Sequence, residues 1–251
     1  MSLRLALPLL LCFLAGCVSS GKIDPTRTPE GRNDARDAFV QLGIGYLQQG
    51  ETARAKQPLG RALELDPRSA DAHAALALVF QAEMEPELAD RHFRSALAQS
   101  RDARILNNYG SFLFEQGRFK DAYERFQQAA EDTMYVERSR VFENLGLTAQ
   151  RLGMRDQSQA HFNRALRLDS RRPAALLELA SMAYEDREYV PARRYYENYI
   201  AMAPHTPRSL LLGIRLAEVF DEVDRGASFA LQLRRLYPAS AEYKTYLSEH
   251  Q

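Results

Sequence analysis

The sequence repeats itself at intervals of about 34 residues, and this periodicity constrains the fold more than any other feature of the chain. Units that start at residues 36, 70, 103, 139 and 173 are separated by 34, 33, 36 and 34 residues. The first unit carries Leu42-Gly43, Tyr46, Ala55, Leu59 and Ala62, and the fourth carries Leu145-Gly146, Phe162 and Ala165 at matching places. Small residues at fixed positions let two antiparallel helices approach closely, and large ones fill the space to the next pair. The pattern predicts an all-α solenoid.

The spacing of the Leu-Gly pair, the aromatic residue and the later alanines resembles the tetratricopeptide repeat. This resemblance implies a right-handed α-solenoid of about six repeats that covers residues 35–251. The sixth unit fits in two registers, because Leu216-Ala217 require a start at residue 210, whereas Ala230 and Pro238 require a start at 207. We therefore expect its internal turn to be about three residues shorter than the others. Residues 239–251 are expected to form a C-terminal capping helix, and residues 133–137 an enlarged loop.

Residues 1–16 have the pattern of a signal peptide: a charge at Arg4 precedes an apolar run that is too short to span a bilayer with polar flanks. The sequence Leu14-Ala15-Gly16-Cys17 resembles a bacterial lipobox, which implies that the thiol of Cys17 is acylated and that Cys17 becomes the first mature residue. Because each buried CH₂ contributes about 0.8 kcal/mol, two or three acyl chains would hold the protein at a membrane. The alternatives are an ordinary secretory signal followed by a chance cysteine, and an uncleaved anchor.

The resemblance to bacterial lipoproteins also implies a location. Val18 follows Cys17 in place of the Asp that is associated with inner-membrane retention, so the periplasmic face of the outer membrane is expected. Residues 17–34 are then the acylated cysteine and a flexible tether, because residues 18–34 are rich in Ser, Thr, Gly and Pro and poor in apolar side chains.

Composition and motif searches exclude several classes of function. The 33 basic and 33 acidic side chains leave no positive excess, so nucleic-acid binding is not expected. The two cysteines lie at positions 12 and 17, and the five histidines have no metal-ligand spacing. Neither a phosphate-binding loop nor a nucleophile elbow occurs. We therefore expect a protein that is not an enzyme and that uses no cofactor, metal or small-molecule substrate.

Function is expected to reside on the concave face of the solenoid, which the second, fifth, ninth and twelfth residues of each first helix line. The apolar character of this face in the first two units favours a slot for a partner's helix or hydrophobic segment. An alternative is that the tether or an extra helix covers this slot. The predicted partner-binding groove consists of Val40, Ile44, Leu47, Ala74, Leu78, Gln81, Asn107 and Phe114.

Four longer segments, at residues 71–86, 138–147, 187–196 and 209–217, are more specific than the repeat pattern, because they include groove and turn residues that the repeat does not dictate. They resemble the PilF/PilW family of type IV pilus biogenesis and stability lipoproteins, over essentially the whole mature chain. The resemblance implies a pilotin, an outer-membrane lipoprotein that binds PilQ-like secretin subunits and promotes their delivery and multimerisation. The alternative is a lipid-anchored scaffold for another envelope complex, which would use its convex face or the tyrosines of the fifth unit, Tyr184, Tyr189, Tyr195, Tyr196 and Tyr199.

Overall fold

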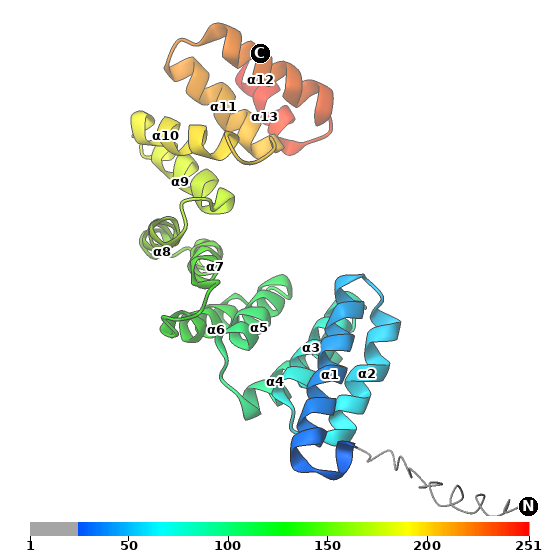
Figure 1. Cartoon of the computed structure of the whole chain (residues 1–251). Helices are drawn as coiled ribbons and strands as arrows, with labels where there is room; N and C mark the ends of the chain where they lie inside the picture. Colours follow the sequence, from blue (N-terminus) through cyan, green and yellow to red (C-terminus); the bar gives the residue numbers. More distant parts are fainter. Residues whose placement is uncertain (1–24, 251) are drawn as a thin grey trace, which may run out of the picture.

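A computed structural model describes residues 25–250, and within this range the chain forms thirteen α-helices and no strand (Figure 1). The predicted signal peptide, Cys17 and the predicted tether up to residue 24 lie outside the described residues. A short 3₁₀ helix, η1, spans Pro25–Arg27. The α-helices are α1 (Pro29–Gln48), α2 (Thr52–Leu65), α3 (Ala70–Ala82), α4 (Pro86–Gln99), α5 (Ala103–Glu115), α6 (Phe119–Glu131), α7 (Arg138–Arg151), α8 (Arg155–Leu168), α9 (Pro173–Glu185), α10 (Tyr189–Ile200), α11 (Pro207–Val219), α12 (Val223–Leu236) and α13 (Ala241–Glu249).

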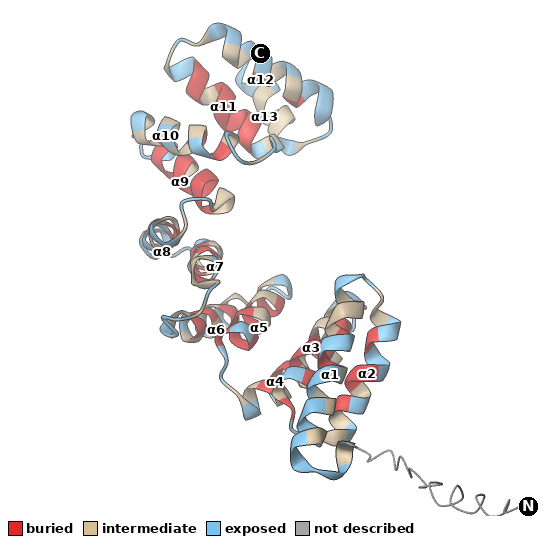
Figure 2. Ribbon diagram, viewed as in Figure 1, coloured by how far each residue is buried: buried red, intermediate tan, exposed pale blue. Residues whose placement is uncertain are grey.

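The first twelve helices form six consecutive pairs that stack into an arc (Figure 1). In the middle of the array the odd-numbered helices line the inner side of the arc and the even-numbered helices its outer side. Each pair packs on its neighbours, so its apolar face is buried by the next unit (Figure 2). The prediction of an all-α repeat solenoid is confirmed.

Close approach within a pair depends on a glycine in the odd-numbered helix and a large side chain in the even-numbered one. A Cβ added at Gly110 would lie 2.6 Å from the ring of Phe126, and one added at Gly146 would lie 2.5 Å from the ring of Phe162. Both rings are fully buried. A helix interior normally disfavours glycine, and here the gain in packing offsets that preference.

The turn inside each pair has three residues, and its middle residue has a positive φ. Three units place glycine there, at Gly50, Gly117 and Gly153, whereas the other three place Met84, Arg187 and Asp221. Residues with a Cβ are strained in this region, so the turns at Met84, Arg187 and Asp221 are held in place by the helices that they connect.

The sixth unit is regular, and the expected shorter turn is wrong. Its helices α11 and α12 are joined by residues 220–222, a turn of the same three-residue length as in the other pairs. The correct register places Leu212-Gly213 at the Leu-Gly position, because Gly213 lies against Tyr196 and Phe229 as the earlier glycines lie against their partners. Leu216-Ala217 resemble the Leu-Gly pair in sequence but lie one helical turn after Leu212-Gly213. This similarity is why the sequence suggested two registers.

The N-terminal boundary also differs from the sequence prediction. Helix α1 starts at Pro29 and not beyond residue 34, and the hydroxyl of Thr28 accepts a hydrogen bond of 3.0 Å from the Gly31 amide at its start. Proline at the first helical position and threonine before it are both favourable at a helix start. The predicted tether therefore includes the first helical turns. At the other end, α13 confirms the expected capping helix, and a loop between α6 and α7 occupies residues 132–137 as expected.

Candidate functional site

Three of the eight predicted groove residues are buried and cannot meet a partner without rearrangement. Val40 is 3% exposed, Ala74 is fully buried and Asn107 is 4% exposed. All three occupy the fifth position of their repeat units, counted from the unit starts at residues 36, 70 and 103, and this position faces neighbouring helices rather than the inside of the arc. Val40 packs on Ala62 and Ala72, for example, so its place in the groove prediction is corrected to a core position.

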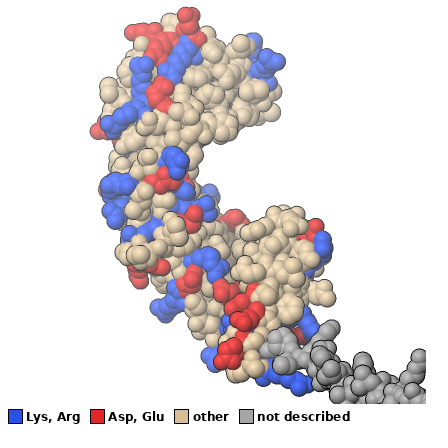
Figure 3. Space-filling view, viewed as in Figure 1, with Lys and Arg blue, Asp and Glu red and all other residues tan. Residues whose placement is uncertain are grey.

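The other five residues are partly exposed and belong to the ninth and twelfth positions: Ile44, Leu47, Leu78, Gln81 and Phe114. Ile44 and Leu47 join the apolar cluster around Leu76 and Val79 in α3, and they leave part of each side chain accessible. These positions form the accessible inner surface. On the face seen in Figure 3, much of the surface that borders the hollow is uncharged, and many charged side chains lie along the outer edge.

Polar side chains bridge successive odd-numbered helices from α3 onward. The Gln81 amide donates to a Glu115 carboxylate oxygen at 2.6 Å, and the Asn144 amide donates to the Asn107 side-chain oxygen at 3.1 Å. Asp71 pairs with Arg104, and Glu143 pairs with Arg172. These contacts satisfy polar groups that the stacking of repeats partly buries.

Another of these bridges surrounds Glu178, whose side chain is 8% exposed. One carboxylate oxygen accepts hydrogen bonds from the Arg208 guanidinium at 2.8 Å and from the Gln150 amide at 2.7 Å, and Arg208 also contacts the other oxygen. The pairing with Glu178 raises the pKa of Arg208. A two-pronged contact of this kind fixes α9 and α11 relative to each other. Sequence reasoning missed it, although a glutamate between the apolar residues Leu177 and Leu179 was a visible signal.

One cavity of about 210 Å³ opens at the predicted inner positions of α5 and α7. Its lining consists of the apolar residues Phe114, Phe126 and Leu147 and the polar residues Ser111, Glu115 and Asn144. The Phe114 ring contacts the Phe119 ring edge-on, with centroids 5.2 Å apart, and the Arg151 guanidinium lies 5.7 Å from its centroid. An apolar cavity with a few polar groups at its rim is suited to a side chain of a bound protein segment. The sequence identified Phe114 but not this combination.

The aromatic surface proposed for the fifth unit is largely internal. Tyr196 and Tyr199 are buried, and burial raises the pKa of the Tyr196 phenol above its ordinary value. Tyr184, Tyr189 and Tyr195 are only partly exposed. Three histidines have pKa values below the ordinary one, chiefly because burial disfavours the charged ring: His92, His161 and His205.

Within residues 25–250, no group of three or more His, Cys, Asp or Glu side chains is placed to hold a metal ion. In the same range, no helix combines the length and the apolar character needed to cross a bilayer.

Comparison with known proteins agrees with this architecture. Two family models, both described as tetratricopeptide repeat, match residues 101–171 and residues 40–87 and 144–207. The curated "Type IV pilus assembly protein PilF" of Pseudomonas aeruginosa strain PAO1 is 55% identical over 251 residues, which cover 99% of this chain and all of that protein. A solved structure of Pseudomonas aeruginosa PilF has a TM-score of 0.85 at 56% identity and covers 87% of this chain and 99% of that one. The crystal structure of PilW, described as a widely conserved type IV pilus biogenesis factor, has a TM-score of 0.71 at 26% identity, with 84% and 98% covered.

The repeat architecture, the bridged inner helices and the family models together define a tetratricopeptide-repeat protein, a class whose surfaces serve protein–protein interaction. Within that class, identity over the full length places the chain in a particular family. It belongs to the PilF family of type IV pilus assembly proteins.

Proposed function

We propose that this protein acts in type IV pilus biogenesis as a pilotin, an outer-membrane lipoprotein that binds secretin subunits and promotes their localisation and multimerisation. The observation that carries the proposal is the 55% identity to PilF over 99% of the chain, on a solenoid whose surface is hollowed on its inner side (Figure 3). The secretin as partner follows from the family resemblance of the four segments described above.

The proposed contact surface is the inner face around the cavity of α5 and α7. Ile44, Leu47 and Leu78 offer accessible apolar surface toward the N-terminal end, and Phe114 and Leu147 flank the cavity itself. Farther along, the buried carboxylate of Glu178 is occupied by its contacts with Gln150 and Arg208. A partner segment with an apolar face would therefore gain most from this N-terminal half of the arc.

Binding alone does not bring secretin subunits to a membrane, and lipidation at Cys17 would supply this membrane attachment. Secretin subunits must meet in one membrane before they form a ring. A lipid-anchored binder confines them to that membrane and so raises their effective concentration, as a linker does for two tethered sites.

Delivery is tested in a strain that carries Cys17→Ala with its signal cleavage site repaired, by separating inner and outer membranes and measuring heat-stable secretin multimers against monomers. We expect multimers to disappear or to move to the inner membrane while the soluble variant still binds secretin. Normal outer-membrane multimers in a strain without the gene would refute the pilotin assignment and favour the scaffold alternative.

Binding is tested with Phe114→Glu and Leu147→Glu, which place a carboxylate at the cavity mouth. The matched control is Leu168→Glu, because Leu168 is 43% exposed and belongs to α8, a helix on the outer side of the array. We expect the two cavity variants to lose at least tenfold in affinity for purified secretin with unchanged helicity, and the control to bind as the parent does. Equal binding by all three would remove the cavity from the interface.

A further inference from the structure

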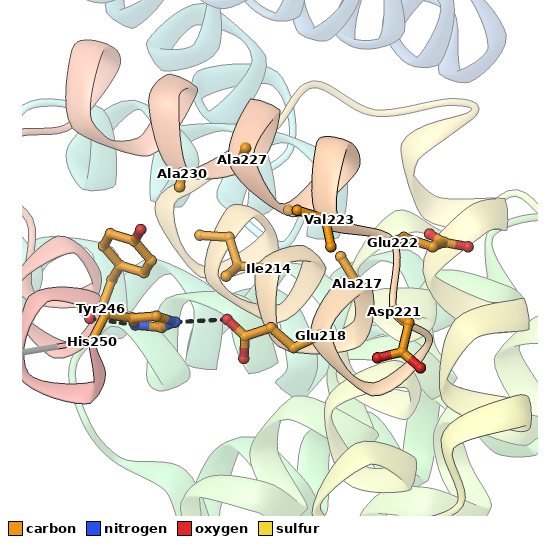
Figure 4. Close-up of a pocket in the computed structure, with 11 residues that line it drawn as sticks. Ile214, Ala217, Glu218, Asp221, Glu222, Val223, Ala227, Ala230, Tyr246 and His250 are labelled. Atoms are coloured by element: carbon orange, nitrogen blue, oxygen red, sulfur yellow. Dashed lines mark hydrogen bonds and ion pairs between the residues drawn. The ribbon is translucent and has the colours of Figure 1, made fainter.

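A second cavity, of about 420 Å³, lies at the C-terminal end of the array between α11, α12 and α13, and we call it the C-terminal groove (Figure 4). Its apolar lining consists of Ile214 and Ala217 from α11, Val223, Gly226, Ala227 and Ala230 from α12, and the ring of Tyr246 from α13. Figure 4 shows Tyr246 and His250 on one side and Val223 and Glu222 on the other, with Ile214 between them. None of these residues belongs to the inner-face site.

The groove is open because α13 is short. It has nine residues, whereas the odd-numbered helices α3, α5, α9 and α11 have thirteen. It packs on α11 mainly, through the Arg215–Glu249 pair and the contact of His250 with Glu218 at 2.7 Å. Helix α12 therefore lacks the cover that the next unit gives the earlier even-numbered helices. Val223 is 78% exposed as a result.

The rim of this groove is acidic. Glu218, Asp221 and Glu222 line it, and Asp224 lies beside them in the first turn of α12. The nearby cations are engaged: Arg225 pairs with Glu197 and Glu222, and His250 pairs with Glu218. Among the described residues, Asp221 and Asp224 have no ion-pair partner within 4.0 Å. The groove thus combines an apolar floor with uncompensated negative charge.

Asp221 also occupies a backbone position that disfavours it. It is the middle residue of the α11–α12 turn, with φ +54, where three other units have glycine and two have Met84 and Arg187. Glycine would relieve this strain, so the carboxylate is held at the groove mouth at the expense of local stability.

From this charge complementarity we propose that the C-terminal groove docks a basic amphipathic segment of a partner protein. Apolar side chains of the segment insert between Ile214 and Ala227, and an adjacent lysine or arginine pairs with Asp221 or Asp224. A segment of this composition neutralises the rim while it covers the apolar floor. This inference concerns a surface separate from the inner face and does not rest on the pilotin assignment.

The test uses a phage library of random dodecapeptides, selected on the full chain and depleted against the full chain with Ala227→Arg. Ala227 is exposed, so arginine there fills the groove mouth and reverses its charge without touching the core. Selected peptides are synthesised with a fluorescent label, and their affinities are measured by anisotropy. The variants compared are Asp221→Asn and Ala227→Arg, with Ala160→Arg as the control because Ala160 is an exposed alanine of α8.

We expect the surviving peptides to place Lys or Arg within a turn of apolar residues and to bind more weakly as salt is added. Ala227→Arg should lower their affinity at least tenfold and Asp221→Asn about threefold to tenfold, while Ala160→Arg should leave it unchanged. The proposal is overturned if no peptide survives depletion, if the survivors lack basic residues, or if Asp221→Asn binds them as the parent does. Selected peptides that lose binding with Phe114→Glu occupy the inner face and also overturn it.

Discussion

Two glycines on α1, two residues apart, are expected to respond in opposite directions to the same substitution. A Cβ at Gly43 would lie 2.4 Å from Leu59 Cγ and 2.6 Å from Leu59 Cδ2, and Leu59 is fully buried. A Cβ at Gly45 would meet no atom within 4 Å. Both lie in the interior of the same helix, so they share its intrinsic preference for alanine.

The magnitudes follow from these distances. Alanine in a helix interior is favoured over glycine by about 0.8–1.0 kcal/mol, so Gly45→Ala should stabilise the first repeat by about that amount. Ordinary carbon contacts lie at about 3.5–4.0 Å, so Gly43→Ala requires Leu59 or α2 to move by about 1 Å. Overpacking of this kind costs about 1–3 kcal/mol. Because the helix preference cancels, the two variants should differ by about 1–3 kcal/mol in free energy of unfolding.

The assay is urea unfolding followed by circular dichroism, together with amide hydrogen exchange in α1 and α2, since a repeat array can unravel from its ends. Adding Leu59→Val to Gly43→Ala should cost less than the sum of the two single changes, because a smaller side chain makes room for the new methyl group. Equal stabilisation by Gly43→Ala and Gly45→Ala would refute the close-approach argument.

Three further predictions concern the turns, the histidines and the inter-repeat bridges. Met84→Gly and Arg187→Gly, at turn positions with φ 60 and 61, should each raise the free energy of unfolding by about 0.5–1 kcal/mol in urea titrations, because removing the Cβ relieves left-handed strain; a loss of stability would contradict this. Folding lowers the pKa of His92, His161 and His205, so these side chains bind protons at a higher pH in the unfolded chain than in the folded protein. Thermal stability should therefore fall as the pH drops from 7 through 6.5. Substituting glutamine for each histidine should make the stability less dependent on pH. His250, whose pKa is raised by the Tyr246 carbonyl and Glu218, acts in the opposite direction, with stability lost as the pH rises through its folded-state pKa. Arg208→Met should lower the free energy of unfolding by about 1–3 kcal/mol because it leaves the buried Glu178 carboxylate without its cation, whereas Arg171→Met, at a side chain that is 83% exposed, should change it little in the same urea assay.

The repeat pattern predicted the helices well because it records contacts between near neighbours. Unit starts at residues 70, 103 and 173 coincide with the first residues of α3, α5 and α9. The Leu-Gly pairs marked the closest approaches within units, as at Gly43 and Gly146. The sixth unit was misread because Leu216-Ala217 satisfied the pattern one turn too late, and only the position of Gly213 against Phe229 identifies the true register. Helix α1 began earlier than expected because the Thr28 cap and Pro29 start a helix in a segment whose composition resembles a linker.

The groove was predicted less well than the helices. The position of a residue in the repeat predicts the direction of its side chain from the helix. It does not predict how much of that side chain the next unit buries. Three residues that were predicted to line the groove are therefore buried in the structure: Val40, Ala74 and Asn107. Phe114 is accessible as predicted, and it lines a cavity together with Leu147 from the following unit. The C-terminal groove had no signal in the pattern at all, because it arises from the short length of α13 and its contacts with α11.

The sequence by itself determined the class of fold, the number of repeats and the family, since each depends on residues close together in the chain or on similarity along its whole length. The tertiary structure alone decided which inner residues are accessible, how Glu178 is bridged to Arg208, and where cavities open. The physical reason is that burial and pairing between units depend on the angle and distance at which each helix pair stacks on the next. Many small contacts together determine that angle and distance, and no local sequence pattern records their sum.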